Sequence, residues 1–575
     1  MRMNILFSVA ILVMLFDSCK KAGSGPVTPP ATDTTTIAPQ VDPPVANTIG
    51  FFLNDWQPKN FTLPASTIAG TVPASAGVII QIDRSNVLTK IPRGIAGNNS
   101  NIWMGQFVTE PVLLGHLTKM KPHIIRFPGG SISDIFFWNA QNNVPPTDAP
   151  SSLVQANGNV VPAGYWYGKN AENWTFSVDN YYNMLQQTNN EGMITINYGY
   201  ARYGKSADPV ATAAHMAADW VRYDNGRTKY WEIGNENFGD WEAGYRINTT
   251  DNRDGQPEFL TGQLYGQHFK VFADSMKAAA AAIGKTIYIG AVMSEAAPES
   301  WWTSTARNWN TGIMTGAGSS PDYYIVHNYY TPYQTNANAA TILTTAQTVT
   351  QNMMDYVKQQ LSAGGVPQKP VILGEFNITS QGQKQQVSHI NGLHATMVLG
   401  ESIKNKYGMT ARWDLANGWS NGNDHGLFNI GDEPGGIPKW NPRPAFYHMY
   451  YFQQYSGDRM VASTSTDPNV VSYASSFSSG ETGVVLVNKS TTVKTAAITV
   501  ANFKKGTQYF WYTLTGGTDN GEFSGQTFVN DIAPDNATGG PLGYETIKPY
   551  SASTTSGIKI SLPARAAVFL VILKP

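Results

Sequence analysis

Two apolar runs of the sequence each end in a glutamate. Residues 230–237 (YWEIGNEN) carry Asn235 and Glu236, and residues 370–377 (PVILGEFN) carry Glu375. A carboxyl group at the end of a buried strand can transfer a proton or attack a bound substrate, provided that the strand end opens onto a cleft. A glutamate at a strand end is more often a solvated cap or a salt-bridge partner, so either run alone leaves that alternative open.

These two runs belong to a series of short apolar segments separated by longer helical or loop stretches, a rhythm typical of β/α units. Eight segments are predicted strands: 78–82, 123–127, 194–199, 229–234, 286–292, 323–328, 370–376 and 411–415, of which the first is the least regular. Helices are expected at 211–221, 265–283, 341–361, 387–404 and 444–455. This order predicts a (β/α)₈ barrel with enlarged loops.

In such a barrel the carboxyl ends of the strands open onto one face, where substrates bind. Asn235 and Glu236 would reach that face from strand four and Glu375 from strand seven. Two further strand ends carry polar groups. Arg126 lies in 122–130 (PHIIRFPGG), and His327 and Tyr329 lie in 325–330 (IVHNYY), where they share one side of an extended strand,.

Each of these residues also has a structural interpretation. Arg126 could pair with Glu232 in the barrel interior instead of lying under Glu375. A single histidine on an apolar strand, such as His327, is usually a satisfied core group. The agreement of several strand ends in the right order favours the functional interpretation.

The set of strand-end motifs between about residues 94 and 455 resembles clan A retaining glycoside hydrolases. The resemblance implies that Glu236 protonates the glycosidic oxygen, that Asn235 hydrogen-bonds the sugar 2-hydroxyl, and that Glu375 is the nucleophile. It also implies that Arg126 keeps Glu375 ionised and that Tyr329 hydrogen-bonds the Glu375 carboxylate. A retaining mechanism requires the two carboxyl groups to lie about 5 to 5.5 Å apart.

Residues 122–130 resemble the α-L-arabinofuranosidase family of this clan in particular. That family usually has a glutamate in the loop after strand one, whereas residues 94–103 (GIAGNNSNIW) contain no acid, which argues against an exo-acting arabinosidase. The clan often has a sugar-stacking tryptophan after strand eight, and both Trp413 and Trp419 are candidates. Further aromatic residues could form sugar platforms or simply pack on the barrel: Trp138, Tyr165, Trp166 and Tyr167 in or beside the insertion 139–173, and Trp241.

Composition excludes several other classes of function. Lys and Arg number 39 against 40 Asp and Glu, so the chain lacks the basic surface of a nucleic-acid-binding protein,. One cysteine excludes a disulfide framework,. No dinucleotide, phosphate-loop or HExxH motif occurs, so neither a cofactor nor a metal is implied,. Residues 418–422 (GWSNG) match the serine-hydrolase elbow, but they continue into polar loop instead of the required helix, so the match is interpreted as chance,. Residues 251–255 (DNRDG) resemble a calcium loop but have an arginine at a ligand position, so they are interpreted as a solvated turn,.

The N-terminus predicts export. Residues 5–16 are mostly apolar but too few to span a membrane, and Cys19 directly follows Ser18,. This arrangement resembles a bacterial lipoprotein signal, which implies cleavage before Cys19, its acylation, and an anchor in the cell envelope. A chance cysteine in an ordinary signal peptide is the alternative. Residues 19–48, rich in Pro, Thr and Ala, are predicted to be an extended tether,.

The C-terminal part, residues 458–575, has short alternating strands without helical periodicity, which predicts a β-sandwich,. Strands are expected at 483–488, 496–500, 508–514, 558–562 and 566–573. We therefore expect a signal peptide at 1–18, the tether at 19–48, strands at 49–90 that could join the sandwich, the barrel at 91–457 and the sandwich at 458–575.

Together these observations favour a lipid-anchored retaining glycoside hydrolase. The leading hypothesis is an endo-acting enzyme on a plant-type or algal polysaccharide. An α-L-arabinofuranosidase and a surface lipoprotein that binds glycans without cleaving them are the alternatives.

Overall fold

Eight parallel strands close into a barrel, in the order in which the chain supplies them. The computed structural model describes residues 37–575 except 122, 334, 381 and 383. The barrel strands are β3 (Gly97–Asn99), β4 (Ile124–Phe127), β9 (Glu191–Ile196), β10 (Tyr230–Ile233), β11 (Tyr288–Val292), β12 (Tyr323–Asn328), β13 (Val371–Phe376) and β14 (Met409–Arg412).

Seven of these strands overlap the predicted ones, but the predicted first strand is wrong. Residues 78–82 belong to β2 (Val78–Lys90), which pairs with strands of the C-terminal sheet. The first barrel strand is β3, which has no apolar pattern and is defined by its pairing with β14 and β4. Alternate residues are buried at the start of β2. Such a pattern is typical of any strand with one buried face, so it does not identify the sheet to which the strand belongs,.

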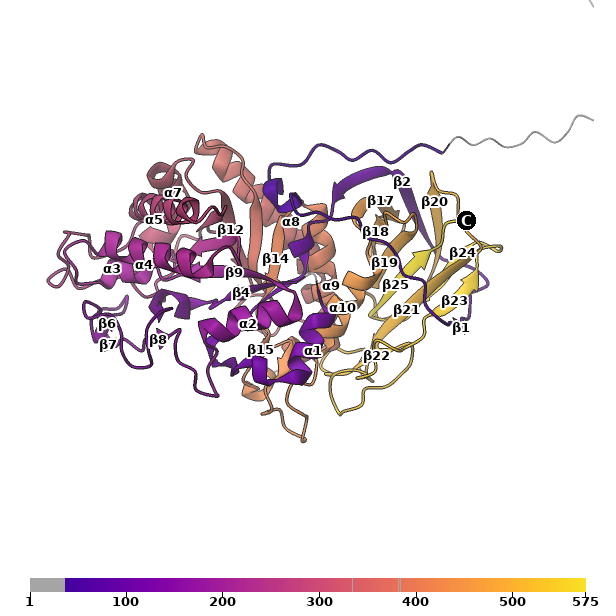
Figure 1. Ribbon diagram of the computed structural model, residues 1–575. Helices are drawn as coiled ribbons and strands as arrows, with labels where there is room; N and C mark the ends of the chain where they lie inside the picture. The colour runs from indigo at the N-terminus through magenta and orange to yellow at the C-terminus, as the bar shows by residue number, and fades with distance from the viewer. Residues whose placement is uncertain (1–36, 122, 334, 381, 383) are drawn as a thin grey trace, which may run out of the picture. The chain divides into compact units, whose positions relative to one another are not determined.

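Helices surround the barrel, as Figure 1 shows. Several begin where the local sequence supplies a cap: Asp208 accepts a hydrogen bond from the Ala211 N–H at the start of α4, and Asn338 accepts one from the Thr341 N–H at the start of α8,. The main helices are α1 (Pro111–Lys119), α2 (Val178–Thr188), α4 (Pro209–Asp224), α5 (Gly262–Ala282), α7 (Trp309–Ala317), α8 (Ala339–Ala363), α9 (His389–Lys404) and α10 (Pro444–Tyr455). All five predicted helices are present.

A short 3₁₀ helix, η1 (Gly50–Leu53), packs on the amino-terminal end of the barrel. Phe52 is buried among residues at the starts of the strands, including Tyr230 and Tyr323, and the Thr48 carbonyl accepts a hydrogen bond from the Val371 N–H at 2.9 Å. This end of the barrel is therefore filled by side chains, which leaves the opposite end for a substrate.

The C-terminal region forms a separate sheet of eleven strands that folds over its own hydrophobic core. Besides β2 its strands are β1 (Ile68–Ala69), β17 (Arg459–Ser465), β18 (Val470–Ser476), β19 (Thr482–Asn488), β20 (Lys494–Ala501), β21 (Gln508–Gly516), β22 (Thr527–Val529), β23 (Tyr550–Ser553), β24 (Ile558–Leu562) and β25 (Ala566–Ile572). In Figure 1 the indigo strands β1 and β2 lie among these yellow and orange ones. The predicted fold class, a (β/α)₈ barrel with an all-β sandwich, is confirmed.

Successive residues of β19 face different cores. Val484 and Leu486 point into the sandwich, whereas Val485 and Val487 belong to the hydrophobic cluster that includes the barrel helices. His389, at the start of α9, also donates a hydrogen bond from its Nε2 to the Arg565 carbonyl at 3.0 Å. Residues 38–575 accordingly form one compact unit.

Among the residues that the structure describes, no helix has both the length and the apolar composition needed to span a membrane. The predicted signal peptide and Cys19, and most of the tether, lie outside the described residues.

Candidate active site

The predicted site residues meet at the carboxyl ends of four barrel strands. Arg126 comes from β4, Asn235 and Glu236 follow β10, His327 and Tyr329 lie at the end of β12, and Glu375 lies near the end of β13. This is the face on which (β/α)₈ enzymes bind their substrates.

Arg126 is fully buried and connects most of the cluster. Its Nε donates to Glu232 Oε2 at 2.6 Å, and its Nη1 donates to Glu375 Oε1 at 2.8 Å. Nη1 also donates to Asn99 Oδ1, and Nη2 donates to Asn235 Oδ1, both at 2.8 Å. The sequence left open whether Arg126 binds the predicted nucleophile Glu375 or pairs with Glu232. In the structure it does both.

The two predicted catalytic carboxylates face each other across a short gap. One carboxylate oxygen each of Glu236 and Glu375, together with a ring nitrogen of His327, lie within 4.8 Å of one another. Tyr329 donates its hydroxyl to Glu375 Oε2 at 2.9 Å, and His327 Nδ1 is 2.9 Å from Glu236 Oε1. The gap fits the short separation of a retaining glycosidase and is too small for the roughly 6.5 to 9.5 Å of an inverting one.

Opposing effects act on the Glu375 carboxyl. Burial raises its pKa above the ordinary value, and the nearby Glu236 carboxylate raises it as well,. The cations of His327 and Arg126 and the hydroxyl of Tyr329 lower the same pKa. Together these effects raise the pKa of Glu375. That Arg126 keeps Glu375 ionised therefore stays a prediction.

His327 lies between the carboxylates and tends to hold a proton there. Burial lowers its pKa, but the Glu375 charge and the hydrogen bond to Glu236 raise it, and the net direction is upward. Burial and the same two carboxylates also raise the pKa of Tyr329 well above its ordinary value, so its hydroxyl remains a donor. The cluster thus combines two cationic groups with three carboxyl groups, Glu232 included.

These pKa shifts predict a specific pH dependence. A nucleophilic Glu375 must be ionised, so kcat/KM should fall as the pH drops through its raised pKa, above the ordinary value of 4.5,. His327→Gln removes a cation that lowers this pKa, so the acid limb of the pH profile should move to higher pH. An unchanged or lowered acid limb in this variant would contradict the electrostatic account.

Two buried acids that the sequence analysis missed hold the loop around Glu236 in place. Asp134 accepts hydrogen bonds from the N–H groups of Tyr198 and Gly199, both at 3.0 Å, and from the Asn237 side chain at 2.7 Å. Burial raises its pKa to about 7, although these donors lower it. Asp134 lies in a short 3₁₀ helix (Ser131–Ile135) and Glu242 in an irregular loop, each within ten residues after a strand end, and only that position could have singled them out.

Glu242 positions Asn235, which was predicted to contact the sugar. Glu242 Oε1 accepts hydrogen bonds from Asn235 Nδ2 at 3.0 Å and from the Ser131 hydroxyl at 2.8 Å. Burial and the charges of Asp134 and Glu236 raise the pKa of Glu242 well above its ordinary value. With Arg126 bonded to its oxygen and Glu242 to its nitrogen, the Asn235 amide has a fixed orientation.

We expect Glu242→Ala to lower kcat about 10²-fold, because the Asn235 amide loses its orientation and moves relative to the substrate. Glu242→Gln keeps the shape and one acceptor oxygen and should retain most of the activity. Steady-state kinetics and thermal unfolding of both variants test this role. Equal activity of the two variants would show that Glu242 positions nothing that matters for catalysis.

The strand-one loop is occupied by contacts within the protein. Asn99 Nδ2 donates to the Gly374 carbonyl at 3.0 Å, and Asn98 Nδ2 donates to the Arg412 carbonyl at 3.2 Å. Asn101 donates to the buried Asp414 carboxyl. These amides fix the loop against β13 and the end of β14. Their donor groups are therefore used within the protein, whereas a glutamate of the arabinofuranosidase type would bind the sugar.

The two candidate platforms after strand eight lie in different surroundings. Trp413 is partly buried and packs on the turn after Arg126, where a Cβ added to Gly130 would be 2.6 Å from its ring. Trp419 lies in the following loop, with its N–H bonded to Asp432 at 2.8 Å and the Arg443 guanidinium 5.7 Å from its ring centroid. Trp413 is thus the one beside the cluster.

Trp138 is buried and is not a sugar platform. Its ring stacks on Trp220 with centroids 5.6 Å apart, and its Nε1 donates to the Met216 carbonyl at 3.0 Å. The structural alternative therefore holds for this residue, because the insertion folds back onto α4.

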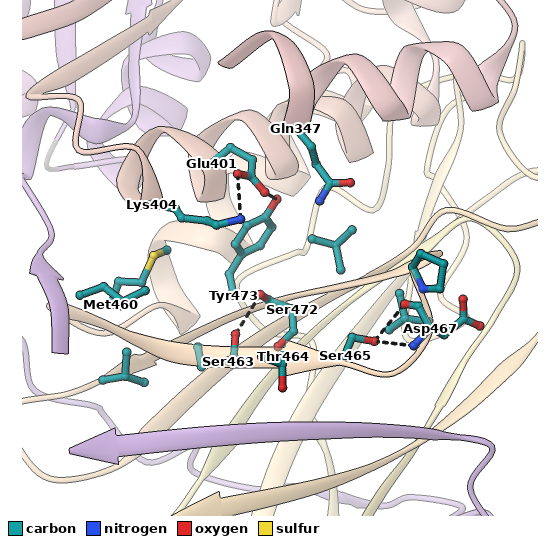
Figure 2. Close-up of a pocket in the computed structure, with 16 residues that line it drawn as sticks. Gln347, Glu401, Lys404, Met460, Ser463, Thr464, Ser465, Asp467, Ser472 and Tyr473 are labelled. Carbon is teal, nitrogen blue, oxygen red and sulfur yellow. Dashed lines mark hydrogen bonds and ion pairs between the residues drawn. The ribbon is translucent and has the colours of Figure 1, made fainter. Parts of the chain in front are cut away.

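A cavity of about 230 Å³ lies elsewhere, between the end of α9 and strands β17 and β18 (Figure 2). Glu401 and Lys404 line it from the helix, and Tyr473 donates to Glu401 at 3.0 Å. Because α9 runs back along the barrel, its C-terminal end lies toward the amino-terminal ends of the strands, away from the catalytic cluster.

Among the described residues, one group of three side chains has the geometry of a metal site, and it is Glu236, His327 and Glu375 themselves. A metal there would compete with the hydrogen bond between His327 Nδ1 and Glu236 and with the Arg126 contact to Glu375.

Comparisons with known proteins agree with this geometry. The family model described as the alpha-L-arabinofuranosidase 1 domain matches residues 116–347, a stretch that includes Arg126, Glu236 and His327 and ends before Glu375. No curated protein matches the chain.

Solved structures share the fold at low sequence identity. An α-L-arabinofuranosidase from Thermotoga maritima is 16% identical, with a TM-score of 0.57, over 86% of this chain and 100% of that one. The GH51 arabinofuranosidase from Xanthomonas axonopodis pv. citri is 15% identical, with a TM-score of 0.58, over 87% and 100%. CelM2, a bifunctional glucanase-xylanase from a metagenome library, is 14% identical, with a TM-score of 0.54, over 87% and 99%.

The family model lies within the barrel that carries the carboxylate cluster, and the solved structures share the fold. Together these findings confirm the prediction of a glycoside hydrolase that is similar to the clan A retaining enzymes.

Proposed function

We propose that the protein cleaves bonds within a plant-type or algal polysaccharide by double displacement, with Glu375 as nucleophile and Glu236 as acid and base. The observation that carries the mechanism is the separation of at most 4.8 Å between the facing carboxylate oxygens. The endo mode is supported by the strand-one loop, which lacks the acid that an exo-acting arabinofuranosidase would use.

In the first step a Glu375 oxygen attacks the anomeric carbon and forms an ester as the glycosidic bond breaks. Protonated Glu236 gives its proton to the departing oxygen, which leaves as a sugar hydroxyl. Arg126 and Tyr329 each donate to one oxygen of Glu375 and hold the carboxylate in position for the attack.

In the second step water attacks the same carbon. Glu236, now ionised, takes a proton from the water, and the ester bond to Glu375 breaks to restore the carboxylate. Two displacements on one carbon give net retention of the anomeric configuration.

Two alternatives remain testable. An α-L-arabinofuranosidase is favoured by the matched family model. A surface protein that binds glycans without cleaving them would require a distorted cleft, which the short carboxylate gap argues against.

Incubation with a panel of plant and algal polysaccharides, followed by reducing-end assay and product sizing, tests the proposal. Early release of medium-length fragments supports endo cleavage, and release of arabinose alone supports the arabinofuranosidase. Retention on a polysaccharide without new reducing ends supports the binding protein. Glu375→Gln is the negative control.

The enzyme should keep full activity in EDTA, because Arg126 and His327 already supply the positive charge next to Glu375. Turnover before and after prolonged chelation, with and without added divalent cations, measures this. Loss on chelation with recovery on adding a metal would instead assign Glu236, His327 and Glu375 as metal ligands.

We further propose that the chain is exported and anchored through acylated Cys19, with the residues that follow Cys19 linking the lipid to the folded protein; the end of the predicted tether, at Thr48, is hydrogen-bonded to the barrel. Mass spectrometry of the N-terminal peptide from membrane fractions of the native host, compared with Cys19→Ser, would detect or exclude the lipid.

A further inference from the structure

Two tryptophans beside the candidate active site are exposed and face a shared pocket. Trp241 has 61% of its surface exposed and Trp301 has 79%. They line a cavity of about 290 Å³ with neighbouring residues of the same two loops. The other lining residues are Phe238, Gly239, Asp240, Trp302, Thr303 and Ala306. Exposed aromatic groups gathered in this way mark a binding site more often than a free surface.

The loop that carries Trp241 is attached to the catalytic cluster at both ends. The Gly239 N–H donates to the Glu236 carbonyl at 2.7 Å, and the Glu242 N–H donates to the Gly239 carbonyl at 3.2 Å. Glu242 is in turn bonded to Asn235. A Cβ on Gly239 would lie 2.4 Å from the Trp241 ring, so the glycine allows the ring to lie over this turn. Trp241 therefore has a defined position next to Glu236.

The opposite wall comes from the loop after β11. Glu295, near the start of this loop, accepts a hydrogen bond from Asn328 Nδ2 at 3.0 Å, and Asn328 follows His327 directly. The Trp302 N–H donates to the Glu299 carbonyl at 3.1 Å, and Thr303 caps the next helix turn. This wall thus begins at the end of β11, next to the end of β12 that supplies His327 to Glu236.

The position of the pocket relative to the two glutamates decides which part of a substrate would reach it. In a retaining glycosidase the acid/base carboxyl lies at the glycosidic oxygen, on the leaving-group side of the bond. The two walls of the pocket are the loop after β10, which also carries Glu236, and the loop after β11. Glu375 lies on β13, further around the barrel. The pocket therefore belongs to the leaving-group side.

We propose that this pocket binds the leaving-group portion of the polysaccharide, with sugar rings stacked on Trp241 and Trp301. The inference rests on the proposed function and adds a binding site to it. Aromatic faces accept the C–H face of a pyranose, and the exposed Asp240 carboxylate can accept a sugar hydroxyl,. A volume of about 290 Å³ suits a small ligand,. A protein partner would need roughly 800 Å² of contact surface per side.

The test compares two substrates with the same glycon. One is the polysaccharide that the enzyme cleaves fastest in the panel, and the other is the glycosyl fluoride of its oligosaccharide product. Fluoride is a single atom and cannot fill the pocket. For Trp241→Ala and Trp301→Ala, the ratio of kcat/KM on the polysaccharide to kcat/KM on the fluoride should fall about tenfold. Trp241→Phe keeps an aromatic face and should retain most of the ratio.

Trp174→Ala is the matched control, because Trp174 is 49% exposed on a different loop and should leave the ratio unchanged. An unchanged ratio in both Trp241→Ala and Trp301→Ala would overturn the inference, as would an equal loss on both substrates. If the wild-type protein cleaves neither substrate, the proposed function fails and the inference fails with it. If Glu375→Gln cleaves neither the polysaccharide nor the fluoride while the tryptophan variants keep the wild-type ratio, the proposed function stands and only the inference fails.

Discussion

Glu375→Gln should lower turnover by a factor on the order of 10⁴ or more, on every substrate that the enzyme cleaves. The amide cannot attack the anomeric carbon to form a stable ester, so the first step of the proposed mechanism is blocked. The substitution keeps the size of the side chain and leaves one acceptor oxygen in place of the two that Tyr329 and Arg126 bind in the wild type. Initial rates on the best polysaccharide and on its product fluoride measure the loss.

The matched control is Glu401→Gln. Glu401 is also a buried glutamate, with a hydrogen bond from Tyr473 (Figure 2), but it is near the C-terminal end of α9, away from the catalytic cluster. This variant should keep wild-type activity, and thermal unfolding of both variants separates loss of catalysis from loss of fold. Substantial turnover by a folded Glu375→Gln protein would rule out Glu375 as the nucleophile.

Replacement of Glu236 should have a large effect that depends on the leaving group. Glu236→Gln should lower kcat/KM on the polysaccharide about 10²- to 10⁴-fold, because the sugar oxygen would have to leave without a proton. On the glycosyl fluoride the loss of the first step should be much smaller, since fluoride leaves without protonation. A comparison of the two substrates with one protein preparation gives both values.

A second variant tests the base function of Glu236. In Glu236→Ala the space left by the carboxylate admits azide, which attacks the glycosyl ester without a general base. Added azide should therefore speed up fluoride consumption and yield a glycosyl azide with the configuration of the original bond. Equal losses on both substrates, with no response to azide, would show that Glu236 is not the acid/base.

The sequence predicted those parts of the site that lie on strands. Glu236, Glu375, Arg126 and His327 each end an apolar run, and a parallel barrel brings such ends to one face whatever the loops do. The segments that carry them were therefore found from local patterns alone. Their mutual contacts follow from closure of the barrel, and only the structure gives them.

Other parts could not be predicted, for definite physical reasons. β3 has three residues without an apolar pattern, and it exists as a strand only because β14 and β4 flank it. The run at 78–82 is apolar at four of its five positions, but that composition does not identify the sheet to which it belongs,. Asp134 lies in the short 3₁₀ helix after β4 and Glu242 in the loop after β10, and the course of both segments depends on tertiary contacts.

Aromatic residues were the least predictable group. Trp138 and Trp241 both follow barrel strands and look alike in sequence, yet Trp138 is buried against Trp220 and Trp241 is exposed. The difference arises from the loops: one folds onto α4, while the other is held to the cluster by Gly239 and Glu242. Sequence position alone does not distinguish these outcomes.

The stereochemistry of the first product tests the central claim most directly, since the proposed double displacement between two facing glutamates predicts retention of configuration,. Proton NMR of the anomeric region, recorded within the first minutes of hydrolysis and before mutarotation, identifies the anomer that is released. The account predicts the same configuration as the bond that was cut. Initial release of the opposite anomer would contradict it.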